Sequence, residues 1–136
     1  MNDISNLKNI TVLYVEDEKD LREVTSSILQ SFTKNQYIAT NGQEGYDLFL
    51  KHDSDIDLII SDINMPILNG LEMIKKIKDI NKNVPIIVTT AFSNKEYLLE
   101  AIDIGVDKYD LKPVDVSKLH QAMSQSLNYH ELRDLY

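Results

Sequence analysis

Short apolar runs of strand length alternate with segments of helical periodicity along the chain, and this alternation constrains the fold more than any other feature. Five runs are rich in Ile, Val, Thr and Tyr: residues 10–15, 37–40, 58–60, 84–90 and 108–111. Between them, apolar residues recur every three or four positions, as Leu71, Ile74 and Ile77 do. Such a pattern predicts an α/β fold with a doubly wound parallel sheet, right-handed crossovers and helices on both faces.

Two of the runs, 10–15 and 58–60, are nearly continuous in apolar residues, which is typical of parallel strands covered on both faces. We therefore expect them in the middle of the sheet. A chain of 136 residues has the length of about one domain. The expectation is a single domain over residues 1–136, with the last helix at about 115–134 and a possible extension into a connector.

Capping signals stand where some of the helices are expected to begin. Asn41 with Glu44, and Ser93 with Glu96, have the spacing of a capping box. Asp115 is a suitable cap for the last helix. These residues predict the starts of three helices.

Composition excludes several classes of function. The chain has 22 acidic and 14 basic residues, a net charge of −8, so phosphate backbones and anionic lipids repel it, and we expect neither direct nucleic-acid binding nor membrane binding. Cysteine is absent, which excludes disulfides, thiolate metal sites and a thiol nucleophile. The start of the chain does not have the pattern of a signal peptide, and no apolar stretch has the length of a membrane span. We expect a cytoplasmic protein.

Polar residues follow four of the five runs, at the sheet edge where doubly wound folds bind ligands. They are Glu16-Asp17-Glu18, Asp62, Thr89-Thr90 and Lys112-Pro113. Carboxylates gathered at one edge repel one another unless a cation lies between them, and Mg²⁺ prefers oxygen ligands. Lys112 offers an ammonium and Thr90 a hydroxyl to phosphoryl oxygens. Without a cysteine or an apparent Ser-His arrangement, the candidate nucleophile is a carboxylate, and the central Asp62 is best placed.

Four ordered segments resemble the receiver domains of two-component response regulators. They are VLYVED (12–17), DLIISDINMPILNG (57–70), PIIVTTA (85–91) and YDLKP (109–113). The resemblance covers essentially the whole chain. It implies the flavodoxin-like receiver fold, a five-stranded parallel sheet in the order 2-1-3-4-5 with five helices.

The resemblance also implies roles for individual residues. Asp62 is the phosphoacceptor, and Lys112 holds a phosphoryl oxygen. Mg²⁺, with Mn²⁺ as an alternative, is bound by Glu16, Asp17, Asp62 and the main-chain carbonyl of Asn64. Glu16 stands where aspartate is common in the family, but its longer side chain is still expected to reach the ion.

Two residues are implied to act as a conformational switch. Thr90, which directly precedes the small residue Ala91, moves toward the phosphoryl group, and Tyr109 turns inward behind it. The face formed by the fourth helix, fifth strand and fifth helix then changes, and partners read it. Taken alone, Thr90 is only a good strand former and Tyr109 a half-buried aromatic residue of an edge strand.

The implied partners are a histidine kinase or phosphotransfer protein, a downstream effector or fused output domain, and a second copy in a phosphorylation-dependent homodimer. The receiver would catalyse its own phosphorylation and slow dephosphorylation without being a turnover enzyme. Phe92, two residues past Thr90, also points to slow self-hydrolysis by family analogy. A stand-alone receiver and one cut from a longer protein fit the sequence equally well, so the output stays open.

Two other functions are compatible with parts of this pattern. A phosphohydrolase would release the phosphoryl group quickly, but Asn64 stands where haloacid-dehalogenase-like enzymes have a second aspartate, and asparagine cannot transfer a proton. A receiver-like adaptor would bind its partner without phosphorylation, and the intact set of site residues argues against it. A steady-state phosphatase assay distinguishes a phosphohydrolase from a signalling switch.

Several features are more simply structural. Glu16, Asp17 and Glu18 taken alone would suit a helix N-terminus, and Pro66 and Gly70 are expected to be turn residues. Three histidines at 52, 120 and 130 do not have ligand spacing and are expected to face solvent. Near the end, Tyr129, Leu132 and Tyr136 form an apolar stripe, for which helix packing, a dimer seam and a connector remain open.

Overall fold

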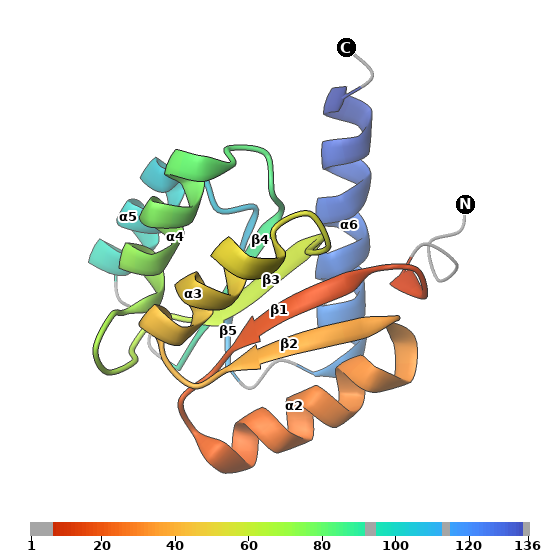
Figure 1. Cartoon of the computed structure of the whole chain (residues 1–136), viewed down its shortest axis with the longest axis horizontal. Coiled ribbons are helices and arrows are strands. Elements are labelled where there is room, and N and C mark those ends of the chain that lie inside the picture. Colours follow the sequence, from red (N-terminus) through yellow and green to blue (C-terminus); the bar gives the residue numbers. More distant parts are fainter. Residues whose placement is uncertain (1–6, 92–94, 113–114, 135–136) are drawn as a thin grey trace.

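Five parallel strands form one sheet in the order β2-β1-β3-β4-β5 (Figure 1). The computed structural model describes residues 7–91, 95–112 and 115–134. The strands are β1 (Thr11–Val15), β2 (Asn35–Ala39), β3 (Leu58–Asp62), β4 (Ile86–Thr90) and β5 (Lys108–Leu111). The order and the central positions of β1 and β3 confirm the prediction, while β2 begins two residues earlier than expected.

Helices cover both faces of the sheet, as the alternation predicted. They are α2 (Lys19–Phe32), α3 (Gly42–His52), α4 (Gly70–Ile80), α5 (Lys95–Ile104) and α6 (Val116–Asp134). In Figure 1, α3, α4 and α5 lie on one face, and α2 and α6 lie on the other. No helix in the described part of the chain has the length and apolar character needed to cross a membrane.

Each face of the sheet has its own core, because successive side chains of a strand point to opposite faces. From β1, Leu13 and Val15 pack into the core under α3, α4 and α5. Val12 and Tyr14 pack into the other core, against residues of α2 and α6. The central strands are thus buried on both sides, which explains their continuous apolar sequence.

The strand register brings the carboxyl ends of the central strands together. Val15 of β1 pairs with Ser61 of β3, so the residues after Val15 lie beside Asp62. Asp62 in turn pairs with Thr89 of β4. The polar residues that follow these strands therefore meet at one edge of the sheet, as expected for parallel strands.

Helix caps agree with the capping signals where the structure describes them. The Glu44 N–H donates to Asn41 Oδ1 at 2.8 Å, and the Lys118 N–H donates to Asp115 Oδ1 at 2.7 Å. Ser93 lies outside the described residues. A complete capping box, formed by Asn69 and Glu72, also begins α4, and its spacing is visible in the sequence.

Gly70 does more than form a turn. It is the first residue of α4, and its N–H donates to the carbonyl oxygen of Ile63 at 2.8 Å. A Cβ at this position would lie 2.0 Å from the carbonyl oxygen of Asp62. Only glycine therefore lets the start of α4 approach the end of β3 this closely.

The prediction that all three histidines face solvent is wrong for His130. Its side chain is 8% exposed, and Nε2 lies 2.7 Å from Asp107 Oδ1. The end of α6 passes over the start of β5, and the sequence pattern of α6 alone could not reveal that contact. His52 and His120 are half-buried against aromatic rings. In the apolar stripe near the end of the chain, the only described side chain is that of Tyr129, which is 57% exposed.

Candidate functional site

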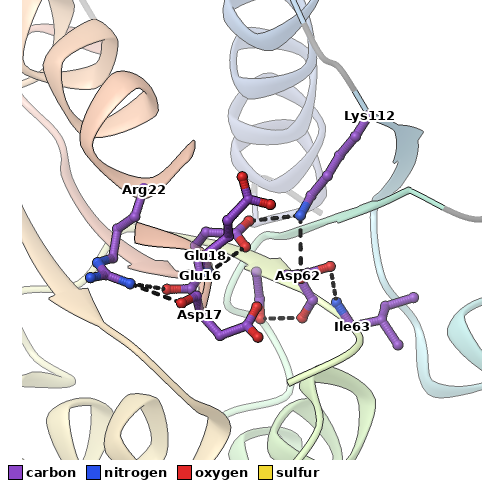
Figure 2. A network of polar contacts seen from close by, with 8 residues as sticks. Glu16, Asp17, Glu18, Arg22, Asp62, Ile63 and Lys112 are labelled. Carbon is purple, nitrogen blue, oxygen red and sulfur yellow. Dashed lines mark hydrogen bonds and ion pairs between the residues drawn. The ribbon is translucent and has the colours of Figure 1, made fainter. Parts of the chain in front are cut away.

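Lys112 joins two carboxylates at the carboxyl edge of the sheet. Its Nζ lies 2.8 Å from Glu16 Oε1 and 3.2 Å from Asp62 Oδ2 (Figure 2). Glu16 directly follows β1, Asp62 ends β3, and Lys112 directly follows β5. The Lys112 N–H also donates to the carbonyl oxygen of Thr90 at 2.7 Å, which fixes the chain where the lysine side chain begins.

Three carboxylates lie close to one another at this edge of the sheet. Glu16, Asp17 and Asp62 each offer an oxygen, and these oxygens lie within 4.8 Å of one another. Glu16 is 1% exposed, whereas Asp17 is exposed to solvent. They border an open cavity of about 350 Å³. It is lined by Glu16, Asp17, Glu18, Asp62, Asn64, Ala91 and Lys112.

Burial shifts the titration of the charged groups. Desolvation raises the pKa of Asp62, although the Lys112 ammonium and the Ile63 N–H oppose this shift. Desolvation also raises the pKa of Glu16, again against the hydrogen bond from Lys112. Burial by itself would lower the pKa of Lys112, but the two carboxylates raise it above its ordinary value. One ammonium is thus shared by two carboxylates whose pKa values burial raises.

Main-chain contacts hold the acidic residues in place. The Ile63 N–H donates to Asp62 Oδ1 at 2.7 Å, and the Glu18 N–H donates to Glu16 Oε2 at 3.2 Å. Arg22 on α2 donates from Nη1 to the carbonyl oxygens of Glu16 and Asp17, at 3.0 and 3.2 Å (Figure 2). The arginine thus fixes the loop after β1 without pairing with its carboxylates.

The donor set fits a divalent ion such as Mg²⁺. Its groups are oxygens, which Mg²⁺ prefers, and the cavity leaves room for water or phosphoryl oxygens to complete the coordination. An ion there would also relieve the repulsion among Glu16, Asp17 and Asp62. Asn64, whose carbonyl was predicted as a ligand, lies on the wall of the same cavity.

Neither of the two predicted switch residues lines the cavity. Thr90 is fully buried at the end of β4, and Ala91, not Thr90, lines the cavity. Tyr109 packs against the core under α5, and its hydroxyl is buried without a hydrogen-bond partner among the described residues. Phe92 lies outside the described residues.

Comparison with known proteins settles the family. A family model for the response regulator receiver domain matches residues 12–124. The chain belongs to the response regulator receiver family. The family explains why these site residues stand at the ends of successive strands of a sheet in the order 2-1-3-4-5.

Solved receiver-like structures agree with the observed fold. The N-terminal domain of an uncharacterized protein from Wolinella succinogenes is 35% identical, with a TM-score of 0.82, and the match covers 91% of this chain and 98% of that one. A response regulator receiver domain protein from Clostridium thermocellum is 25% identical, with a TM-score of 0.85, over 90% of this chain and 98% of that one.

Curated relatives are longer proteins. The response regulator ArlR of Staphylococcus aureus is 34% identical over 91% of this chain but only 55% of its own length. The transcriptional regulatory protein ZraR of Klebsiella oxytoca is 27% identical over 93% of this chain and 28% of its own length. The chain thus spans between a quarter and just over half of these relatives.

The structure adds residues to this receiver site that sequence reasoning missed. Arg22 contacts main-chain carbonyls, for which no side-chain pattern exists. Tyr97 on α5 donates a hydrogen bond to the side chain of Asn64. The two residues are 33 positions apart, so no local spacing could have linked them.

Proposed function

We propose that this receiver is the phosphoacceptor switch of a two-component phosphorelay, in which Asp62 accepts a phosphoryl group from a histidine kinase or phosphotransfer protein. One observation carries the proposal: Lys112 lies within 3.2 Å of Asp62 in a cavity where Glu16 and Asp17 offer further oxygens. This arrangement combines a nucleophile, a fixed cation and a place for a divalent ion. Such transfer depends on positioning and electrostatics.

In the transfer, an oxygen of Asp62 attacks phosphorus and forms the new P–O bond. The P–N bond to the donor histidine breaks, its electron pair stays on the imidazole nitrogen, and that nitrogen takes up a proton. Mg²⁺ would be held by Glu16, Asp17, Asp62 and the Asn64 carbonyl, and would supply positive charge to the phosphoryl oxygens. Lys112, already beside Asp62, neutralises a further phosphoryl oxygen.

Mass spectrometry after incubation with acetyl phosphate tests this proposal. The wild-type chain is expected to gain the mass of one phosphoryl group with Mg²⁺, and far less without it. Asp62→Asn should gain none, because the amide cannot act as the nucleophile. A wild-type chain that stays unmodified while another receiver is labelled under the same conditions would overturn the proposal.

Phosphorylation would be read on the face made by α5, β5 and α6. This face exposes apolar side chains: Leu98, Leu99, Ile102 and Leu111. An effector, a fused output domain or a second copy of the chain would bury them in the phosphorylated state. A cytoplasmic location belongs to this proposal, because the kinase must reach Asp62.

Thr90 and Tyr109 would couple Asp62 to that face. Thr90→Ala should therefore leave labelling of Asp62 within about twofold of wild type, but weaken phosphorylation-dependent partner binding by about tenfold, the lower part of the range for allosteric coupling. Labelling by mass spectrometry and partner binding by calorimetry check the two halves separately. Unchanged binding would show that the signal bypasses Thr90.

Nucleic-acid binding is expected to be absent from this acidic domain itself. ZraR is named a transcriptional regulatory protein, but this chain covers only 28% of its length. Any DNA binding in a longer protein would belong to another part of that protein. An electrophoretic mobility shift with this chain alone should show no complex, with or without phosphorylation.

A further inference from the structure

A hydrogen bond connects helix α5 to the loop that follows the phosphoacceptor. The Tyr97 hydroxyl donates to Asn64 Oδ1 at 2.8 Å. Asn64 comes two residues after Asp62 and lines the acidic cavity, while Tyr97 belongs to the first turn of α5. A contact between segments this far apart in sequence ties the wall of the cavity to a separate helix.

Tyr97 is well placed to act as a fixed support. Its ring is half-buried against the core under α3, α4 and α5, so its position is set by packing. Burial is the larger cause of the raised pKa of Tyr109, and the nearby Tyr97 raises this pKa further. Tyr97 thus stands between the cavity wall and the predicted switch.

The side chain of Asn64, by contrast, is held in place by its hydrogen bond to Tyr97. Its side chain is exposed, and among the described residues Tyr97 is the one side chain that hydrogen-bonds to it. An exposed asparagine without such a bond would rotate among several rotamers. The bond therefore restricts the rotamer of Asn64 and ties its side chain to α5.

We propose that Tyr97 is a positioning residue of the divalent-ion site, which acts by holding Asn64. The inference rests on the proposed function, in which the main-chain carbonyl of Asn64 is an ion ligand. Groups that hold a ligand in place tune metal affinity even though they do not touch the ion. Because Tyr97 belongs to α5, ion binding is also linked to the position of this helix.

Isothermal titration of the full chain with MgCl₂ tests the inference. Tyr97→Phe removes only the hydroxyl and is expected to weaken Mg²⁺ binding about fivefold, the typical worth of one hydrogen bond. Tyr129→Phe is the matched control. It removes a hydroxyl near the C-terminal end of α6, from a residue that does not line the acidic cavity, and should bind Mg²⁺ as the wild type does. Equal affinities of Tyr97→Phe and wild type, within twofold, would overturn the inference.

Asn64→Ala separates this route from a general effect on folding. Alone, it should weaken Mg²⁺ binding to a similar degree, because the carbonyl stays but loses its support. In the Asn64→Ala background, Tyr97→Phe should then cause no further loss. A fivefold loss in both backgrounds would mean that Tyr97 acts by another route and would overturn the inference.

Two further readouts distinguish this inference from the proposed function. In ¹⁵N-¹H spectra, Mg²⁺ should shift amide signals of α5 in wild type, and these shifts should shrink in Tyr97→Phe, which a purely structural role would not produce. If wild type itself binds no Mg²⁺ at millimolar concentrations, the proposed function fails as well. Tight binding that is insensitive to Tyr97 overturns the present inference alone.

Discussion

The two ends of the sheet use acidic residues in opposite ways. At the amino end, Asp57 Oδ2 accepts a hydrogen bond from the first N–H of β1, that of Thr11, at 2.8 Å. Asp107 accepts from the Ile86 N–H at 2.6 Å through one oxygen and pairs with His130 through the other. Each carboxylate there has specific partners and closes the start of a strand.

At the carboxyl end, the carboxylates outnumber their partners. Glu16 and Asp62 share the single ammonium of Lys112, and burial raises the pKa of both. Such a cluster costs stability in the absence of an ion. Acidic residues at the amino end thus stabilise the fold, whereas those at the carboxyl end cost stability, which fits the divalent-ion site proposed above.

Replacing a carboxylate at the amino end of the sheet is expected to cost the most stability. Asp107→Ala should lower the free energy of unfolding by about 3 kcal/mol, because it removes the acceptor of the buried Ile86 N–H and the contact between Asp107 and His130. Asp107→Asn is the matched control, since it keeps an oxygen for the Ile86 N–H, and should cost roughly half as much. Urea denaturation at pH 7 measures both. Equal losses in the two variants would show that the main-chain hydrogen bond adds nothing.

Addition of Mg²⁺ is expected to stabilise the protein through the carboxyl end of the sheet. At a Mg²⁺ concentration ten times its Kd, the wild type should gain about 1.4 kcal/mol of stability, since the ion binds only the folded state. Asp17→Asn should lose most of this gain, because it removes an exposed ligand from the acidic cluster. Thermal unfolding with and without MgCl₂ is the measurement. Asp107→Asn, changed at the other end of the sheet, should respond to the ion as the wild type does.

The same contrast explains how much the sequence could predict. Strand runs, helical periodicity and the rule that ligands bind beyond the carboxyl ends led from the sequence to a doubly wound parallel sheet and to Glu16, Asp62 and Lys112. The strand order came from the resemblance to receiver domains. These features repeat at fixed local spacings or follow from topology. The local signals therefore indicated the carboxyl end of the sheet, where buried charged residues do not stabilise the fold.

Contacts that depend on how the helices pack escaped prediction. His130 was expected to face solvent, yet it pairs with Asp107 because α6 runs back over the start of β5. The contacts of Tyr97 and Arg22 likewise depend on where their helices pass the loops. No periodicity encodes such pairs, since they arise only after the helices have packed on the sheet.

A smaller change in stability is expected when Asp62 itself is replaced, and this change should depend on pH. Asp62→Asn should stabilise the chain without Mg²⁺ at pH 7 by about 1 kcal/mol, because it removes a buried charge from the acidic cluster. The pKa of Asp62 is raised in the folded state, so the contribution of its carboxyl group to stability is fully present below its ordinary pKa near 4 and is lost as the pH rises through the folded value. The advantage of Asp62→Asn should therefore shrink as the pH falls from 7 toward 4. Urea denaturation of both chains at several pH values checks the trend, and a variant less stable than wild type at pH 7 would mean that the pairing of Asp62 with Lys112 outweighs its burial.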